Sequence, residues 1–319
     1  APLYGGGAGL VTGHIGIVGA GLVGGGWSIV FARAGEQVRV YDAAPAIRDD
    51  FKTVVGQQLD DLKSYDLVAD PTAIMARIQV CDNLEDVVKG ARFIQESVLE
   101  ETEVKTEISN AIGPLLEAGA VVGSSTSGIP GSAFTEHAVN RERFLVTHPV
   151  NPPYLVPVVE VVPTPWTAQD SVDAALALMT QIGQSPVLVR REVEGFILNR
   201  LQGALLREAW DLFEAGYASA EDIDKTVSEG LGLRWSFMGP IETIDLNAPG
   251  GVADYAARLG PLYHSIQKSR TDPQPWSAEL IGDVDKERRA ALPSDKLAAR
   301  RNWRDRRLMA LAAHKAKQT

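Results

Sequence analysis

The sequence predicts an α/β fold with a mostly parallel sheet and helices on both faces, followed by an all-helical second domain. Three observations carry this prediction. Short apolar, strand-like runs alternate with helical segments from His14 to Val189. A glycine-rich turn, Gly19–Gly24, follows the first of those runs. Beyond Arg190, segments with helical periodicity succeed one another with no convincing strand between them. We therefore expect two domains, covering residues 1–190 and 191–319.

The first elements form a recognisable unit. His14–Gly19 is an apolar strand, Leu22–Ala34 continues as a helix with small residues near its start, and Gln37–Tyr41 is the next strand. Asp42 stands at the end of that second strand. A strand, a glycine turn, a helix, a strand and an acid in this order are what a Rossmann-type dinucleotide-binding domain requires.

The turn residues have separate tasks in such a site. The first glycine permits the tight turn, the second lets backbone approach the pyrophosphate, and the third lets helix and strand pack closely. The free N–H groups of the helix N-terminus then face the phosphates. Asp42 would accept hydrogen bonds from the adenosine ribose and repel a 2′-phosphate, so NAD is preferred over NADP. The cofactor-binding residues predicted in the turn are Gly19, Gly21, Leu22, Val23 and Gly24.

The alternation continues as far as residue 189. Phe51–Met75 is expected to be helical, and Thr167 with Asp170 fits a capping box at the start of a later helix. The remaining predicted elements are the strands Phe93–Ser97, Ala120–Ser124, Phe144–Thr147, Val156–Val162 and Pro186–Val189 and the helices Glu101–Glu117 and Trp166–Ile182.

The segment His148–Glu160 carries the strongest indication of chemistry. It places an imidazole just before a proline-punctuated turn and a carboxylate at the end of an apolar run. An elbow followed by a returning strand would bring the two side chains together although twelve positions separate them. A histidine oriented by a glutamate is a general base with its tautomer fixed and its imidazolium stabilised. A lone His-Pro beside a strand is more often structural, so the neighbouring residues must decide.

Three further residues are candidates, each with a plainer alternative. Ser127 ends a serine-rich run after a strand and could donate to a substrate oxygen, although such loops often only cap helices. Asn199 lies in an apolar helix start, where its amide serves either a structural hydrogen bond or the reacting oxygen. Arg234 stands beside Trp235 and suits a carboxylate, although most surface arginines are simply solvated.

Composition excludes several classes of function. The net charge of −10 argues against a nucleic-acid surface, and the basic stretch 286–317 is best explained as a solvated helix. Cys81 is the single cysteine, so neither an intrachain disulfide nor a cysteine metal cluster is expected, which suits a reducing cytoplasm. No apolar run is long enough for a membrane span. Ala1–Gly9 lacks the basic and apolar regions of a signal peptide.

Taken together, these residues resemble the 3-hydroxyacyl-CoA dehydrogenase family over nearly the whole chain. Within that family the likeness is greatest to the branch that acts on L-gulonate. The motifs that carry the resemblance are Ile94–Glu96, Ser124–Ser127, His148–Tyr154, Gly183–Pro186, Gly195–Gln202, Phe237–Thr243, Leu246–Ala248 and Leu297–Asp305.

The resemblance implies roles position by position. His148 matches the catalytic base and Glu160 its paired carboxylate, while Ser127 and Asn199 match the residues that hold the substrate oxygen. Asp42 matches the ribose-binding acid. Glu100, Lys105, Ser127 and Asn151 match further cofactor-side positions. The resemblance also implies that the helical domain forms a homodimer and closes the substrate cleft.

The substrate remains open between several hydroxy acids. Acyl-CoA enzymes of the family resemble one another in a lysine-rich helical hairpin after the second strand, whereas residues 43–80 of this chain hold six aspartates and two lysines. Phosphates would meet repulsion there, which favours a small free acid that Arg234 could hold. L-gulonate is the first choice, L-carnitine the second and 3-hydroxybutyryl-CoA the third. A crystallin-like structural or NAD-storing role is the alternative from another class.

Overall fold

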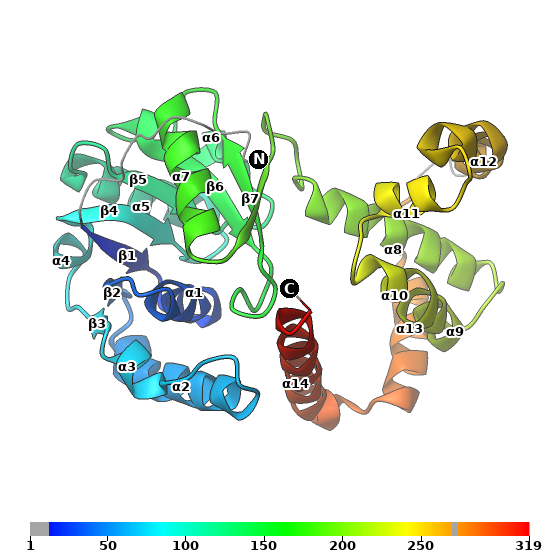
Figure 1. Cartoon of the computed structure of the whole chain (residues 1–319), viewed down its shortest axis with the longest axis horizontal. Coiled ribbons are helices and arrows are strands. Elements are labelled where there is room, and N and C mark those ends of the chain that lie inside the picture. The colour runs from blue at the N-terminus through cyan, green and yellow to red at the C-terminus, as the bar shows by residue number, and fades with distance from the viewer. Residues whose placement is uncertain (1–12, 270–273, 319) are drawn as a thin grey trace. The chain divides into compact units, whose positions relative to one another are not determined.

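The computed structural model describes residues 13–269 and 274–318 (Figure 1). The chain divides into two compact units. The first holds the residues up to Leu201 together with those from Asn302 onward, and the second is Gln202–Arg301. The N-terminal stretch for which no signal peptide was expected lies outside the described residues.

The first unit is built on an eight-stranded sheet with the order β3-β2-β1-β4-β5-β6-β7-β8. Neighbouring strands pair in parallel, except that β6 and β7 are antiparallel. The strand order reverses between β1 and β4, and ligands of such sheets bind at the carboxyl ends of the strands near this point. The strands are β1 His14–Val18, β2 Val38–Tyr41, β3 Ile78–Val80, β4 Ala91–Glu96, β5 Val121–Ser124, β6 Phe144–Pro149, β7 Val158–Pro163 and β8 Ser185–Leu188.

Helices cover both faces of this sheet, as the sequence predicted. The helices are α1 Leu22–Arg33, α2 Pro45–Ser64, α3 Pro71–Met75, α4 Leu84–Val88, α5 Thr102–Ile112, α6 Ser132–Thr135 and α7 Gln169–Gln181, with short 3-10 turns at Gly113–Leu115 and Arg141–Arg143. The final helix, α14 Leu297–Ala316, enters this unit at Asn302. Its Met309 is buried in the core.

The core lies in two layers because successive strand residues point to opposite faces. Ile17 belongs to the larger cluster, which α1, α2, α3 and α7 complete. The next residue, Val18, belongs to the smaller cluster, beside Val87 of α4 and Ile112 of α5. The same alternation places Phe93 in the first layer and Ile94 in the second. The sheet is therefore buried on both sides, so its polar side chains gather at the strand ends.

All regular secondary structure described in the second unit is helical, which confirms the predicted fold class. Its helices are α8 Leu198–Glu214, which starts in the first unit, α9 Ala220–Lys225, a π-helical stretch Thr226–Leu231, α10 Gly232–Trp235, α11 Pro240–Leu246, α12 Gly251–Lys268, α13 Ala278–Ala291, a 3-10 turn Ser294–Lys296 and the first residues of α14. Helices α8 and α12 contain no fully buried residue.

Two local predictions were wrong. The single helix expected over Phe51–Met75 is instead two helices, α2 and α3, interrupted where Asp66 adopts a positive φ of 59° and Pro71 begins the second helix. The capping box also fails, because α7 begins after Ala168 without a side-chain cap and the Thr167 hydroxyl donates to the Phe144 carbonyl instead.

None of the described helices combines the length and the apolarity that crossing a membrane requires.

Candidate active site

His148 and Glu160 meet at the carboxyl end of the sheet. They are register partners on the antiparallel strands β6 and β7, and Nδ1 of His148 lies 2.8 Å from Oε2 of Glu160. The two residues are only 5% and 2% exposed. The predicted elbow and returning strand are confirmed. Because Glu160 takes Nδ1, the other ring nitrogen, Nε2, is the one left to exchange a proton with a ligand.

The elbow between β6 and β7 is held from outside. Arg33 of α1 donates to the carbonyl of Tyr154 at 2.8 Å, and Gln184 donates to the carbonyl of Pro153 at 3.1 Å. Pro153 also packs so closely on α1 that a Cβ at Gly26 would lie 2.8 Å from its ring. Asn151 is exposed at the start of this elbow. The segment is thus fixed by packing and hydrogen bonds, and it sets where β7 returns.

The second carboxylate oxygen of Glu160 binds the start of α8. Oε1 accepts from the backbone N–H groups of Ile197 at 2.8 Å and Leu198 at 2.9 Å. Burial raises the pKa of Glu160, but the hydrogen bonds from His148 and from these N–H groups outweigh it, so the pKa lies below its ordinary value. The carboxylate therefore stays charged beside the imidazole.

Phe196 lines the dyad just before α8. It is fully buried and adopts a positive φ of 52°, directly after Gly195 with a φ of 74°. Its ring centroid lies 5.6 Å from that of His148. This sharp turn allows one segment to deliver both the Phe196 ring and the N–H groups that bind Glu160.

Ser127 and Asn199 are brought together as well. The Asn199 amide donates to the backbone carbonyl of Ser127 at 2.5 Å. This bond matches the structural alternative for Asn199, and its predicted contact with a reacting oxygen remains a prediction. No hydrogen-bond partner is found for the Ser127 hydroxyl among residues 13–269 and 274–318. The loop does not cap a helix, because α6 begins only at Ser132.

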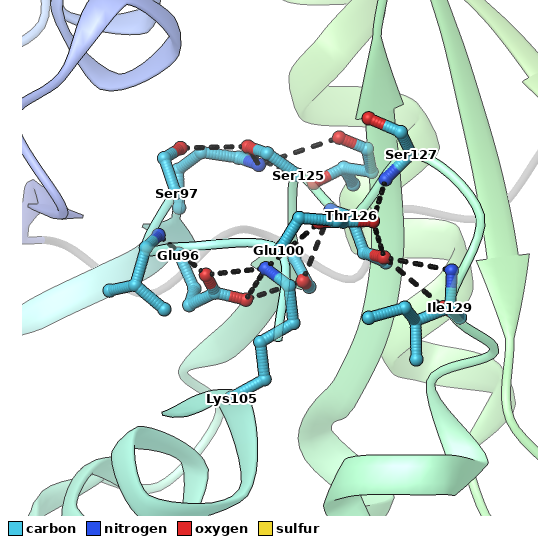
Figure 2. A network of polar contacts seen from close by, with 12 residues as sticks. Glu96, Ser97, Glu100, Lys105, Ser125, Thr126, Ser127 and Ile129 are labelled. Carbon is cyan, nitrogen blue, oxygen red and sulfur yellow. Dashed lines mark hydrogen bonds and ion pairs between the residues drawn. The ribbon is translucent and has the colours of Figure 1, made fainter. Parts of the chain in front are cut away.

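The Ser127 loop is tied to the loop after β4 through Glu100 (Figure 2). Oε1 of Glu100 accepts from the Thr126 hydroxyl and the Ser127 N–H, both at 2.7 Å. Burial raises the pKa of Glu100, but the Thr126 hydrogen bond, the charge of Lys105 and backbone N–H groups bring it below its ordinary value. An ionised carboxylate thus orders the loop that carries Ser127.

The buried Lys105 pairs with one buried and one exposed carboxylate (Figure 2). It is 1% exposed, and its Nζ lies 3.0 Å from Oε1 of Glu96 and 3.5 Å from Oε2 of Glu100. Glu96 also accepts from the Val98 N–H at 2.7 Å and from the Ser124 hydroxyl. Lys105 is therefore committed to these partners, and the direct cofactor contact implied for it remains a prediction.

The glycine turn has the shape of a phosphate cradle. A Cβ at Gly24 would lie 1.8 Å from the Gly19 carbonyl, and one at Gly19 would lie 2.5 Å from backbone atoms of Ser97. A Cβ at Gly21 would meet nothing within 4 Å. Gly21 also caps α1 without a side-chain hydrogen bond, which leaves N–H groups of the first turn, including those of Leu22 and Val23, for an anion. These residues fit a dinucleotide pyrophosphate.

Asp42 stands beside this turn. Its Oδ2 accepts from the Ala20 N–H at 2.8 Å and its Oδ1 from the Ala44 N–H at 2.9 Å. Arg48 donates to the backbone carbonyl of Asp42 at 2.6 Å. The carboxylate is thus held at the end of β2, where an acid is expected to bind a ribose.

Three residues that make hydrogen bonds around the site were not predicted individually. Glu96, Ser97 and Ser125 organise the strand ends around the predicted site. Glu96 and Ser125 lie inside motifs that carry the family resemblance, and Ser97 directly follows one. The signal that could have found them is their position, since each ends or follows a buried parallel strand.

Arg234 belongs to the second unit. It is exposed on α10, and its charge acts on Tyr255 of α12, whose hydroxyl lies 2.8 Å from that of Tyr263. The pKa of Tyr255 is raised by this hydrogen bond, and Arg234 counteracts the rise. Its role toward a carboxylate remains a prediction.

Comparison with known proteins identifies the family. Residues 14–193 match the model of the 3-hydroxyacyl-CoA dehydrogenase NAD-binding domain, and residues 195–289 match the model of the C-terminal domain. The chain belongs to the 3-hydroxyacyl-CoA dehydrogenase family. It is accordingly an NAD-dependent oxidoreductase that acts on hydroxyl groups, as the glycine turn and the resemblance predicted.

Proteins with high similarity to this chain include the lambda-crystallins. The chain is 39% identical to the human lambda-crystallin homolog over 316 residues, covering 96% of this chain and 97% of the relative. It is 40% identical to lambda-crystallin of Oryctolagus cuniculus, with 94% and 96% covered. L-carnitine dehydrogenase of Streptomyces coelicolor is 37% identical, with 86% and 83% covered.

A solved structure shares the fold. The NAD⁺-dependent 5-formyl-3-hydroxy-2-methylpyridine 4-carboxylic acid 5-dehydrogenase has a TM-score of 0.80 and 28% identity, with 94% of this chain and 97% of that one covered.

Proposed function

We propose that this enzyme oxidises the 3-hydroxyl of a small hydroxy acid, and that the acid is L-gulonate, which becomes 3-dehydro-L-gulonate. The observation that carries the reaction is the contact of 2.8 Å between His148 Nδ1 and Glu160 Oε2. It leaves Nε2 as the basic nitrogen at the carboxyl end of the sheet. A buried base with a charged orienting partner suits removal of a hydroxyl proton.

His148 takes the proton of the substrate hydroxyl at Nε2. Glu160 stabilises the imidazolium that results, and its own charge is secured by the N–H groups at the start of α8. Ser127 and Asn199 hold the substrate oxygen so that the carbinol carbon is positioned for reaction. Bound NAD supplies the hydride acceptor.

The proposed cofactor residues are those of the glycine turn and the neighbouring strand ends. First-turn N–H groups, including those of Leu22 and Val23, would bind the pyrophosphate beside Gly21, where no protein atom fills the space. Asp42 would accept hydrogen bonds from the ribose hydroxyls. Glu100 and Asn151 are assigned to the nicotinamide side with Ser127. Lys105 is assigned to the cofactor side as well, because it pairs with the carboxylates of Glu96 and Glu100.

L-gulonate is proposed on two grounds. The similarity to lambda-crystallins extends over 94% or more of the chain. Lambda-crystallin is the L-gulonate 3-dehydrogenase branch of the family to which the sequence showed its greatest likeness. Helices α2 and α3, with their connections, carry the aspartate-rich segment, which is unsuited to the phosphates of a CoA thioester. Arg234 is proposed to bind the carboxylate of the free acid.

L-carnitine is the second candidate, because L-carnitine dehydrogenases of two Streptomyces species are 37% and 38% identical to this chain. A trimethylammonium group favours an aromatic surface without a nearby positive charge. Tyr255 and Tyr263 stack with ring centroids 6.4 Å apart, but the Arg234 charge acts on Tyr255. We therefore rank L-carnitine second.

We also propose that the helical domain, residues 191–319, serves substrate binding and homodimer formation. Large apolar side chains of the second unit are exposed, with Phe237, Ile241 and Leu246 between 66% and 72%. A second copy could cover them. Light scattering on the purified protein should give the mass of a dimer, and a monomer at micromolar concentration would refute this proposal.

The test of function is a screen for NADH formation over L-gulonate, L-carnitine, 3-hydroxybutyrate and 3-hydroxybutyryl-CoA. L-gulonate should give the highest kcat/KM. A strong preference for the thioester would overturn the substrate while leaving the chemistry intact. Absence of turnover with every hydroxy acid, alongside normal NADH binding, would favour a structural or NAD-storing role.

A further inference from the structure

A cluster of buried polar side chains lies beside the glycine turn, at the point where the strand order reverses. Ser125 follows β5, and its hydroxyl oxygen contacts three groups, of which Ser97 is labelled beside it in Figure 2. These are Nε1 of Trp27 at 3.1 Å, Nε2 of Gln95 at 2.7 Å and the hydroxyl of Ser97 at 2.7 Å. These contacts determine which group donates and which accepts in each hydrogen bond of the cluster.

The orientation of Gln95 is set by Thr147. The Thr147 hydroxyl lies 2.8 Å from Oε1 of Gln95, and the backbone carbonyl of Thr147 lies 3.4 Å from Nε2. A carbonyl only accepts, so it selects the NH₂ side of the amide. Gln95 and Thr147 are fully buried. Gln95 therefore donates to Ser125.

Ser125 consequently has both of its lone pairs occupied. The indole N–H of Trp27 and the NH₂ of Gln95 can only donate, and a hydroxyl accepts two hydrogen bonds. The contact between the two serine hydroxyls could run in either direction if it were isolated. With both lone pairs filled, the Ser125 O–H must donate to Ser97. The proton of the Ser97 hydroxyl is then directed away from this cluster.

No other acceptor for this proton is found among residues 13–269 and 274–318. Ser97 directly follows β4, is half-buried, and donates its backbone N–H to the Val18 carbonyl at 2.7 Å. The glycine turn lies against it, because a Cβ at Gly19 would meet the Ser97 backbone at 2.5 Å. The hydroxyl thus stands at the carboxyl ends of β1 and β4, where a dinucleotide crosses such a sheet.

We infer that Ser97 is a cofactor-binding residue whose hydroxyl is oriented by the buried Trp27–Gln95–Ser125 cluster to donate to an oxygen of NAD. The phosphates and riboses of the dinucleotide present only oxygen acceptors and hydroxyls there, so an oriented donor adds affinity. This inference rests on the cofactor and not on the substrate proposed above.

The direct test is calorimetric titration of NADH into the Ser97→Ala enzyme without substrate. One hydrogen bond is worth about 1 kcal/mol, so the affinity for NADH should fall roughly three- to tenfold. Ser97→Thr, which keeps the hydroxyl, should restore most of it. Ser64→Ala, which removes an exposed serine hydroxyl of α2, is the matched control and should bind like wild type. Unchanged affinity in a folded Ser97→Ala enzyme would overturn the assignment.

The orienting role of the cluster is tested by a double-mutant cycle. Trp27→Phe keeps an aromatic ring against Phe31 but removes one of the two N–H donors that occupy the lone pairs of the Ser125 hydroxyl oxygen. It should weaken NADH binding in the wild-type background by less than Ser97→Ala does, and have no further effect in the Ser97→Ala background. Equal losses in both backgrounds would show that Trp27 does not act through Ser97.

Discussion

Nδ1 of His148 lies 2.8 Å from Oε2 of Glu160 across the antiparallel strands β6 and β7, and the same carboxylate accepts two N–H groups from the start of α8. One buried carboxylate therefore orients the imidazole and anchors the helix that leads into the second unit. Mutation of Glu160 can therefore distinguish the orientation of His148 from the anchoring of α8.

Replacing Glu160 by glutamine should remove the orientation of His148 while sparing the anchor. Oε1 of glutamine can still accept from Ile197 and Leu198, but its NH₂ group would face Nδ1 and select the tautomer with a proton on Nε2. The imidazole would then be unable to act as a base, so kcat should fall roughly 10²–10⁴-fold. The melting temperature should fall less for Glu160→Gln than for Glu160→Ala. Similar melting of the two variants would refute the anchoring role.

The charge of Lys105 should matter chiefly for stability of the strand ends. Lys105→Met would leave the buried Glu96 without its cation, and breaking such a buried pair costs about 3 kcal/mol of unfolding free energy. Lys89→Met is the matched control, because its pairing with Glu85 is solvent-exposed and should contribute little. Urea denaturation compares the two. A stable Lys105→Met protein would contradict this account.

Stability should decline in acid through Glu160 and Glu100. The folded-state pKa of each lies below the ordinary value of 4.5, so their stabilising contribution is present above that value and is lost as pH falls through the lowered pKa. Urea midpoints measured from about pH 6 to about pH 3 should therefore fall for the wild type. The fall of the urea midpoint with decreasing pH should be shallower for Glu100→Gln. An unchanged fall would show that Glu100 does not contribute to the acid sensitivity.

Gly21 should be required for the cofactor and dispensable for folding. Its φ of −69° suits any residue, and an added Cβ would meet no atom of the protein within 4 Å. Gly21→Ala should therefore keep the thermal midpoint but weaken NADH binding by occupying the pyrophosphate space. Gly260→Ala, another glycine whose Cβ would meet no neighbour, is the control. Wild-type NADH affinity in Gly21→Ala would place the pyrophosphate elsewhere.

The sequence was informative where local pattern determines structure. The glycine turn and the acid at Asp42 predicted the strand, helix and strand around them, and the proline elbow predicted that His148 and Glu160 would meet. These features depend on contacts close in sequence or on strand alternation. The break between α2 and α3 was missed because Asp66 adopts a left-handed conformation that its residue type only weakly indicates.

The wider polar network could not be predicted from sequence. Lys105 was expected beside the cofactor, and its burial between Glu96 and Glu100 depends on how α5 packs against the ends of β4 and β5. The hydrogen bond from Asn199 to Ser127 joins residues 72 positions apart. Ser97 acquires its direction only through Ser125, Gln95 and Trp27. Such relationships are set by tertiary packing, which periodicity and motif spacing do not specify.

The proposed function depends above all on His148 as the base of an NAD-dependent hydroxy acid dehydrogenase. The most direct measurement pairs turnover with NADH affinity in His148→Ala. In this variant kcat should fall roughly 10²–10⁴-fold while the dissociation constant for NADH stays within about twofold of wild type. Full turnover in this variant would contradict the assignment of His148.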